Sequence, residues 1–318
     1  MTLVRDPNDI TLGMAGMKPP NYHPYSWSAI LNGYDRGEMA KCPAPRIPRY
    51  LGCEPTQNFP IPGVRVTHIY TDDPAYALHV SKAALIPHVV ARPEDLIGKV
   101  DAVLIPTDVG HEHVERCRPF VEAELPIFVD KPLVDNEADL QLFSRWVREG
   151  RAIMSSSCLR YCKEFMPYRA SIHNLGRVAF ATITMSQRWE QYGIHALEGI
   201  YPIFGSGFLS AQNLGTTEQN VVHYKHRCGT DIVVAVTRDM EGADGVLQLC
   251  GSLGTVHAQF SDYFYAFKAQ LEAFIRYLRT GVRPFPFGET EELMKMVIGA
   301  DLSLREGRRE VQLDEITT

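Results

Sequence analysis

The segment from Val100 to Leu133 constrains the fold most, because it places two short apolar runs on either side of a helical pattern. The first run, Ala102–Ile105, is too short for a helix and predicts a strand buried on both faces. A helix is expected over about residues 111–124, and a second buried strand over Ile127–Val129. Strand, helix and strand within so few residues imply a right-handed parallel crossover.

Polar residues follow both of these expected strands. Thr107 and Asp108 come after the first strand, and Asp130, Lys131 and Pro132 come after the second. Ligands of open parallel sheets bind beyond the carboxyl ends of the strands. Because a residue before proline favours an extended backbone, we expect the Lys131 ammonium to project from the strand end. Lys131 is therefore a candidate site residue.

The sequence V-D-A-V-L-I-P-T at 100–107, a helix, and F-V-D-K-P-L at 128–133 together resemble the Gfo/Idh/MocA family of glucose–fructose oxidoreductase and inositol dehydrogenase-like enzymes. That family carries Glu-Lys-Pro where this chain has Asp130-Lys131-Pro132. The resemblance covers most of the chain. It implies an NAD(P)-dependent oxidoreductase acting on a secondary hydroxyl of a sugar or cyclic polyol, with NAD or NADP as the cofactor.

The order of elements predicts an α/β protein with two domains. An N-terminal Rossmann-like, doubly wound parallel sheet is expected over 1–157, the dinucleotide-binding domain. A C-terminal α+β domain with a mainly antiparallel sheet is expected over 158–318, for substrate binding and oligomerisation. Further strands are expected over 9–17, 64–70, 87–91, 151–157, 177–187, 220–226, 232–237, 245–250, 255–259 and 310–313. Further helices are expected over 25–34, 75–84, 93–99, 136–150, 165–174, 189–204, 263–279 and 289–306.

Composition excludes several classes of protein. A net charge of −6 without a basic stripe argues against nucleic acid as the main partner. No apolar run approaches the roughly 20 residues that a membrane helix needs, and the N-terminus has no signal-peptide core. Seven cysteines without a regular framework fit a reducing cytoplasm. Cys158 and Cys162 lack accompanying ligands at finger spacing, so we expect no metal site.

The end of the first expected strand carries a degenerate glycine motif. A dinucleotide fold favours G-x-G-x-x-G there, whereas this chain has Gly13-x-x-Gly16-x-Lys18. Lys18 can contact a phosphate by charge, and it also crowds the pocket. The alternative is that Gly16 only begins a turn.

Two aspartates follow the second expected strand, where a dinucleotide fold binds the adenosine ribose. Asp72 or Asp73 can fill that role, and the alternative is a cap for the helix that begins near Pro74. Ser26 is a possible cap for the first helix. The proline-rich stretch 35–63 lacks periodicity and is expected to be a long surface excursion, functional or in a subunit contact. Thr107 is expected near the central phosphates or the nicotinamide ribose.

Hydride transfer from an alcohol requires a proton acceptor and a positive partner for the developing alkoxide. Lys131 can supply the positive partner, and Asp130 and Lys131 are both expected beside the cofactor. The segment G-I-H-A-L at 193–197 resembles the family's G-x-H-x-L, which implies that His195 is the acid/base. The alternative is a histidine packed on a helix face. Only a cleft between the two domains would bring Lys131 and His195 together.

The remaining candidate substrate-binding residues are Gln191, Glu198, Arg160 and Tyr161. The family commonly has aspartates at the first two of these positions. Gln191 cannot act as a base, whereas Glu198 keeps a charge that can orient His195 or bind a hydroxyl. Arg160 and Tyr161 resemble the Arg-aromatic pair before the family's interdomain helix.

The nearby histidines His111 and His113 are weaker candidates, because residues two apart on a helix do not face the same way. We interpret them as lying near a helix cap.

Three functional hypotheses remain. The first is the NAD(P)-dependent oxidoreductase, and the second is a catalytically silent relative that binds a sugar or nucleotide as a sensor or partner subunit. The third, a metal-dependent hydrolase, lacks a ligand cluster. A homodimer or homotetramer is expected through the outer face of the second sheet, around Ile183, Val233 and Leu247.

Overall fold

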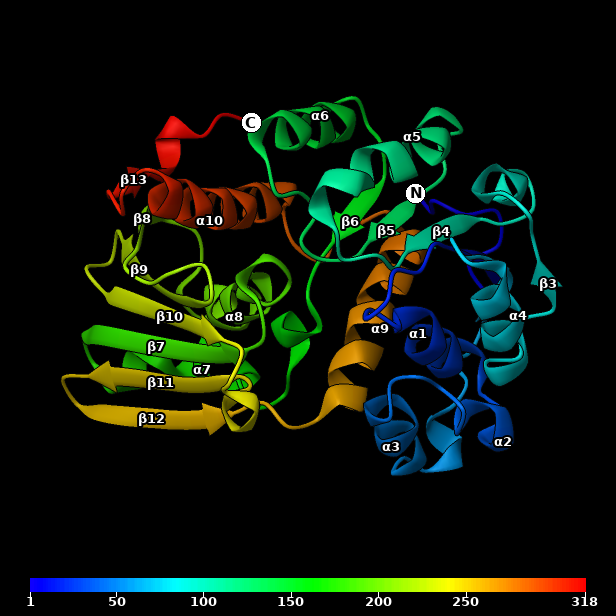
Figure 1. The fold of residues 1–318 in the computed structure, drawn as a ribbon, viewed down its shortest axis with the longest axis horizontal. Coiled ribbons are helices and arrows are strands. Elements are labelled where there is room, and N and C mark those ends of the chain that lie inside the picture. The colour runs from blue at the N-terminus through cyan, green and yellow to red at the C-terminus, as the bar shows by residue number, and fades with distance from the viewer.

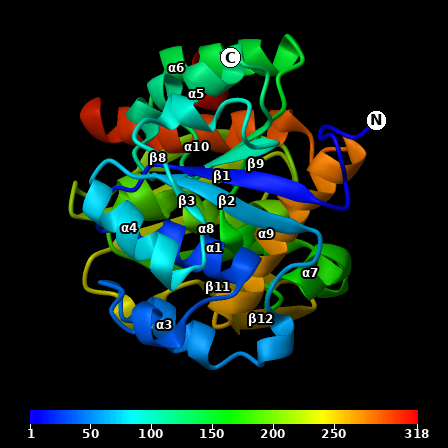
Figure 2. The ribbon, with the colours of Figure 1, turned by 90° about the vertical axis from the view of Figure 1, so that its right-hand side faces the viewer.

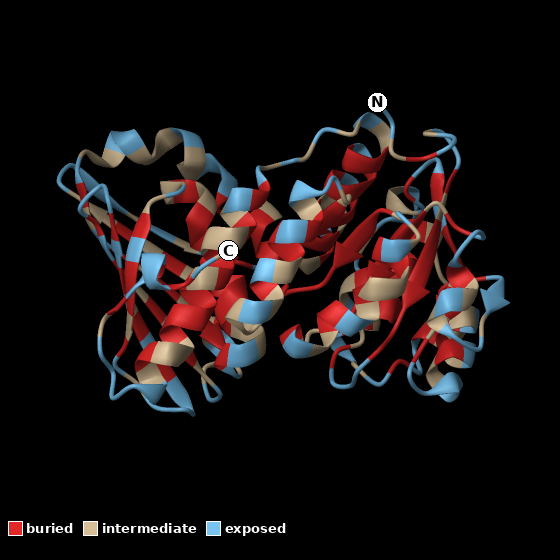
Figure 3. Ribbon diagram, turned by 90° about the horizontal axis from the view of Figure 1, so that it is seen from above, coloured by how far each residue is buried: buried red, intermediate tan, exposed pale blue.

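The computed structural model describes residues 1–318, which form two β-sheets with helices around and between them (Figure 1). One continuous core of 86 buried hydrophobic residues runs through both halves. Figure 3 shows the buried segments passing from one half to the other through the central helices. The predicted fold class, a parallel Rossmann-like sheet followed by an α+β domain, is confirmed.

The first sheet has six strands in the order β3-β2-β1-β4-β5-β6, all parallel. Its strands are β1 (Ile10–Ala15), β2 (Val64–Tyr70), β3 (His88–Val89), β4 (Ala102–Ile105), β5 (Ile127–Val129) and β6 (Ile153–Ser155). The strand order reverses between β1 and β4, which creates a crevice at the carboxyl ends of these two strands. The crossover predicted from residues 100–133 is therefore present, with both strands fully buried.

Helices cover both faces of the parallel sheet, with α1 and α4 on one side and α5 and α6 on the other (Figure 2). Their bounds are α1 (His23–Asn32), α4 (Pro74–Ala83), α5 (His113–Glu122) and α6 (Glu137–Arg148). Asp73 caps α4 by accepting a hydrogen bond from the Ala75 N–H. Of the two roles considered for the aspartates, ribose binding and helix capping, Asp73 therefore has the second. Ser26 does not cap α1. It lies inside the helix, and its hydroxyl donates to the His23 carbonyl.

The second sheet has seven strands in the order β12-β11-β7-β10-β9-β8-β13. They are β7 (Val178–Ser186), β8 (Phe208–Asn213), β9 (Gln219–His226), β10 (Asp231–Thr237), β11 (Val246–Gly251), β12 (Gly254–Gln259) and β13 (Val311–Gln312). Only β7 and β10 pair in parallel. Sequence reasoning missed β8, whose residues F-L-S-A-Q-N alternate weakly between apolar and polar.

Four helices connect or cover the halves: α7 (Met166–Ser171), α8 (Trp189–Phe204), α9 (Tyr263–Thr280) and α10 (Phe287–Arg305). The inner face of the second sheet packs against α8, where Gly199 allows Ile183 and Phe165 to approach closely. Although α9 follows the second sheet in the chain, it packs against α1 of the first half. The domain boundary at residues 157 and 158 stays a prediction.

The proline-rich excursion contains two short helices, α2 (Arg36–Met39) and α3 (Arg46–Gly52). Met39 and Leu51 are fully buried, so the expectation of an aperiodic surface loop is wrong in this part. These short elements escape a periodicity analysis because neither completes more than two turns. The excursion packs against α1 and α9, and it forms one wall of the cavity described below.

The outer face of the second sheet carries no helix, but its residues differ from the expected ones. Ile183 and Leu247 are fully buried on the inner face, and only Val233 points outward. A shift of one residue in the alternation reverses the face of a strand residue, which explains this error. No helix of the structure combines the length and apolar character that crossing a bilayer would require.

Candidate functional site

A cavity of about 1350 Å³ lies between the two halves of the molecule. The loops after β1, β4 and β5, the excursion, and the first turns of α8 and α9 form its walls. Lys18, His23, Asp108, Lys131, Gln191 and His195 are among its lining residues. The cavity thus brings Lys131 and His195 together in one cleft, as the topology required.

Lys131 is almost completely buried, with 3% of its surface exposed, yet its ammonium has only loose partners. The Nζ atom lies 3.8 Å from an Asp108 carboxylate oxygen and donates a long hydrogen bond of 3.4 Å to the Gln191 carbonyl. The Tyr192 ring lies 5.7 Å away. Burial opposes the charge, but Asp130 and Asp108 outweigh it and raise the pKa of Lys131. The ammonium is therefore positive and has donors to spare for a ligand.

Asp130 is buried behind the cavity and does not line it. Its carboxylate accepts hydrogen bonds from the Lys131 backbone N–H at 2.8 Å, from Asn21 Nδ2 at 2.9 Å and from His23 Nδ1 at 2.6 Å. Burial disfavours the charged carboxylate, but the neighbouring His23 and Lys131 outweigh this effect and hold the pKa of Asp130 well below its usual range. Asp130 thus holds two cavity-lining residues, His23 and Lys131, in place.

His195 of α8 lines the same cavity, with 8% of its surface exposed. Its Nδ1 atom lies 2.5 Å from the Ser157 hydroxyl. Burial, and next the positive charge of Lys131, lower the pKa of His195 well below its usual range. The predicted proximity of Lys131 and His195 is present, and His195 is neutral at physiological pH.

Arg160, Tyr161 and Glu198 are placed behind the cavity and are not among its lining residues. Arg160 is 4% exposed and forms ion pairs with Glu198 and, at 2.8 Å, with Glu289 of α10. Its guanidinium also lies 3.9 Å from the centre of the Phe285 ring. Burial raises the pKa of Glu198 although Arg160 opposes this effect. Arg160 thus connects Glu198 of α8 with Glu289 of α10. Gln191, in contrast, lines the cavity.

The loop after β1 carries a network of charges around Gly16. Lys18 pairs with Glu112, and Arg116 bridges Glu112 and Asp72 at 2.8 Å each. The Asp72 carboxylate also accepts the Met17 N–H at 3.1 Å. Gly16 has a φ of +111°, and a Cβ there would lie 3.0 Å from the Arg116 guanidinium, so glycine is required.

The other predicted cofactor residues occupy different places. Gly13 lies within β1, where its missing side chain makes room for Leu96, and it does not line the cavity. Asp73 is engaged as the α4 cap. Thr107 is fully buried, with its methyl group facing Gly16. Lys18 and Lys131 are the predicted cofactor residues that line the cavity.

His111 and His113 do not line the cavity, as their interpretation near a cap predicted. His111 is exposed and pairs with Asp135 at 2.8 Å. His113 is fully buried, with its ring nitrogens 2.9 Å from the Leu133 carbonyl and 2.8 Å from the Thr107 carbonyl. It links the ends of the loops after β4 and β5.

Sequence reasoning missed His23, Tyr192 and the excursion residues Arg46 and Tyr50, all of which line the cavity. A signal for His23 was present: Pro24 marks the start of a helix that follows β1, and such a start lies at the carboxyl edge of the sheet. The contribution of the excursion had no local signal, because it depends on packing against α9.

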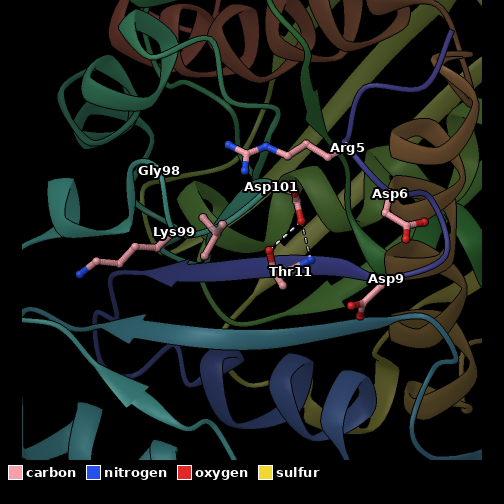
Figure 4. Close-up of a pocket in the computed structure, with 8 residues that line it drawn as sticks. Arg5, Asp6, Asp9, Thr11, Gly98, Lys99 and Asp101 are labelled. Carbon is pink, nitrogen blue, oxygen red and sulfur yellow. Dashed lines mark hydrogen bonds between the residues drawn. The ribbon is translucent and has the colours of Figure 1, made fainter.

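A second hollow, of about 240 Å³, lies at the opposite end of β1 (Figure 4). Asp101 accepts hydrogen bonds there from the Thr11 backbone N–H and hydroxyl, at 2.9 and 2.6 Å. Figure 4 shows Lys99 extending away from these groups. The hollow lies at the amino ends of the strands, away from the crevice that ligands use. No group of three or more His, Cys, Asp or Glu side chains in the structure could hold a metal ion.

No protein-family model and no curated protein matches the sequence. Solved structures do match the fold. Myo-inositol 2-dehydrogenase from Lactobacillus plantarum aligns with 96% of this chain and 99% of its own, at 14% identity and a TM-score of 0.76. Scyllo-inositol dehydrogenase from Lactobacillus casei, with bound NAD(H) and scyllo-inositol, aligns with 96% of this chain and 99% of its own, at 12% identity and a TM-score of 0.75.

An oxidoreductase from Agrobacterium radiobacter, in complex with NAD+, L-tartaric acid and magnesium, aligns with 97% of this chain and 100% of its own. Its identity is 14% and its TM-score 0.74. At these identities the likeness shows the fold. The two-domain architecture that the sequence resemblance implied is the architecture of these dehydrogenases.

Proposed function

We propose that the chain is an NAD(P)-dependent oxidoreductase that acts on a secondary hydroxyl of a sugar or cyclic polyol. The observation that carries this proposal is the cleft itself, which is lined by both the buried, incompletely paired Lys131 ammonium and His195. The sheet places this cleft at the switch point between β1 and β4, where dinucleotides bind in such folds. Neighbours of the same fold are dehydrogenases with NAD(H) or NAD+ and a polyol or hydroxy acid.

A dinucleotide fits this cleft by size and by donor type. Drug-sized ligands occupy roughly 300–1,000 Å³, and a cavity of about 1350 Å³ leaves room for a dinucleotide and a small substrate. Pro19 and Pro20 remove two backbone N–H donors from the loop after Gly16, and Lys18 offers charge in their place. Asp72, at the end of β2, would hold the adenosine ribose. When bound, the nicotinamide would accept a hydride from the substrate carbon.

The residues that line the cavity would then have different roles in the reaction. Lys131 would donate a hydrogen bond to the reacting oxygen and stabilise its developing negative charge. The sequence resemblance makes His195 the candidate for proton exchange with the same oxygen, and Gln191 would contact a neighbouring hydroxyl. Arg160, Tyr161 and Glu198 would act indirectly, because they support α8 from behind the cavity. None of these three residues is proposed to contact the substrate directly.

The test measures binding first and turnover second. NAD+ and NADP+ at millimolar concentration are each expected to raise the melting temperature, because a ligand of the native state stabilises it. Turnover is then assayed on a panel of sugars, inositols and sugar acids by the absorbance of the reduced nicotinamide. If neither dinucleotide raises the melting temperature, the oxidoreductase proposal is wrong.

One observation favours the second candidate, a catalytically silent relative that binds a sugar or nucleotide. Lys18 and Arg116, the cations nearest the expected phosphates, are already paired with Glu112 and Asp72. A melting temperature that rises with a sugar or a mononucleotide but not with a dinucleotide would support this candidate.

We also propose self-association through the outer face of the second sheet. No helix covers this face, and it exposes apolar side chains such as Phe180 and Val221, at 39% and 37%. Uncovered apolar surface of this kind is typical of an interface. Light scattering at micromolar concentration distinguishes a dimer or tetramer from a monomer.

A further inference from the structure

His23 and Asp130 form a carboxylate–imidazole pair at the edge of the cavity. His23 is the first residue of α1, and its Nδ1 atom lies 2.6 Å from Oδ2 of Asp130. Asp130 itself is 1% exposed, and three donors from separate residues hold it in place. The buried Asp130 carboxylate, itself held by three hydrogen bonds, therefore fixes the position of the His23 imidazole.

The chemistry of this pair determines the tautomer of His23. An ionised carboxylate only accepts hydrogen bonds, so the Nδ1 atom that faces Asp130 must carry the proton. In the neutral imidazole, the other nitrogen, Nε2, then holds a lone pair. A histidine fixed in this way is ready to accept a proton at Nε2.

The free nitrogen of His23 is available to a ligand. His23 lines the cavity, with 17% of its side chain exposed, and Nε2 makes no hydrogen bond within the protein. The Nε2 atom is not enclosed by protein, so it reaches the open space of the cavity. Trp27 stacks on the ring at 4.8 Å, and Phe267 meets it edge-on at 5.2 Å, which limits rotation.

The tautomer of His195, in contrast, is not determined by its hydrogen-bond partner. Its Nδ1 atom faces the Ser157 hydroxyl, which can donate or accept, so either ring nitrogen can carry the proton. The Ser157 hydroxyl also accepts the Leu159 N–H at 3.1 Å, which leaves its own proton free to point at His195. In that arrangement Nε2 of His195 would be a donor toward the cavity and not an acceptor.

We propose that His23, oriented by Asp130, takes the substrate's hydroxyl proton at Nε2 in place of His195. This inference rests on the proposed oxidoreductase function. During oxidation the O–H bond breaks and its proton bonds to Nε2, while the carbon loses a hydride to the dinucleotide and the C–O bond becomes a carbonyl. Lys131 would meanwhile hold the oxygen, and neutral His195 would donate a hydrogen bond to the oxygen or to a neighbouring one.

The principal variant is H23N. The asparagine amide can replace Nδ1–H as the donor to Asp130, but it offers no basic nitrogen to the cavity. Loss of a general base typically lowers turnover by about two to four powers of ten, and we expect this loss in kcat with a KM changed less than about threefold. The matched control is H111N, which alters the exposed His111–Asp135 pair outside the cavity and should keep wild-type turnover.

A second variant separates chemistry from structure. H23A opens space next to the cavity, so added imidazole should restore part of the turnover if a base is all that is missing. If H23N is folded by circular dichroism and keeps turnover within about threefold of wild type, the proposal is wrong. A wild type without turnover on any substrate would instead contradict the proposed function, and the proton-transfer role with it.

The tautomer provides a readout that does not depend on activity. In protein labelled with 15N-histidine, the neutral ring of His23 should show a protonated Nδ1 and an unprotonated Nε2. The D130N variant places an amide beside Nδ1 and should reverse this pattern. Observation of a protonated Nε2 in the wild type would overturn the proposal, whatever the turnover.

Discussion

Lys131 and Arg160 are both buried cations that follow strands of the parallel sheet, and they differ in how completely their charges are paired. Lys131 is 3% exposed, and its ammonium lies 3.8 Å from the Asp108 carboxylate and 3.4 Å from the Gln191 carbonyl. Arg160 is 4% exposed and pairs closely with Glu198 and Glu289. Burial alone therefore does not distinguish a ligand-binding cation from a structural one; the closeness of its ion pairs and its access to the cavity do.

The difference follows from what each side chain faces. Lys131 faces the cavity, where a ligand can complete its hydrogen bonds. Arg160 faces α8 and α10, whose carboxylates pair with its Nε and Nη1 atoms, and the Phe285 ring lies against its guanidinium. Its Nη2 atom is enclosed by protein and has no hydrogen-bond partner. We therefore expect loss of Arg160 to reduce stability and loss of Lys131 to reduce turnover.

The largest expected effect is that of R160A on stability. Removing one partner of a buried ion pair typically costs about 3–5 kcal/mol, because the other charge remains buried without compensation. Here that charge is Glu198, which is 3% exposed. Urea unfolding followed by circular dichroism measures the change, with K131A as the matched buried cation. Equal losses for both variants would contradict the distinction between the two cations.

K131A should lower turnover by about two to three powers of ten, because a preorganised positive group is lost from the reacting oxygen. Its affinity for the dinucleotide should change little, since other residues hold the phosphates. Steady-state kinetics and a fluorescence titration of the cofactor measure the two quantities. Near wild-type turnover in both K131A and H195A would refute the catalytic assignment.

Asp301 of α10 extends the comparison to a half-buried carboxyl group without a sufficient partner. Burial, and next the negative charge of Glu190, raise the pKa of Asp301 to about 7. The folded state thus binds the proton more tightly than the unfolded chain, whose carboxyl titrates near 3.8. The stability from this group is complete below about pH 4 and is lost as the pH rises through about 7.

D301N should therefore stabilise the protein at pH 8 by about 1–3 kcal/mol, since each pKa unit corresponds to about 1.4 kcal/mol. At pH 4 the variant and the wild type should be nearly equal. Urea unfolding at both pH values tests this, with D314N at an exposed position as the control. A gain of the same size at both pH values would contradict the assigned titration.

The smallest expected effect concerns Lys18, an exposed cation that already has a partner. K18Q should weaken dinucleotide binding by about three- to tenfold at low salt, and by less at high salt, because solvent ions screen exposed charges. K41Q is the matched control, since Lys41 forms a similar exposed pair with Glu38 away from the cavity. An unchanged affinity at low salt would show that Lys18 does not contact the phosphates.

Local sequence patterns were sufficient to predict an element where the apolar residues of the pattern are also the buried residues of the structure. The buried runs Ala102–Ile105 and Ile127–Val129 are strands with those bounds, and the helix Trp189–Phe204 is also recovered. Position at a strand end also placed Lys131 at the cavity. In these cases the conformation of a short stretch of backbone determines the feature, and the local sequence contains the information for it.

Other features depend on contacts between distant segments, and no local pattern contains them. The role of Arg160 was missed because its partner Glu289 lies 129 residues away in the chain. The pairing of His23 with Asp130 likewise joins residues 107 positions apart.

The sequence by itself determined the alternation of strands and helices, the parallel crossover and the strand end that carries Lys131, because these follow from burial periodicity and backbone preference. Only the tertiary structure decided which charges are satisfied and which face the cavity. Hydrogen bonds and ion pairs act over a few ångströms, and those distances are set when α1, α8 and α10 pack against the two sheets.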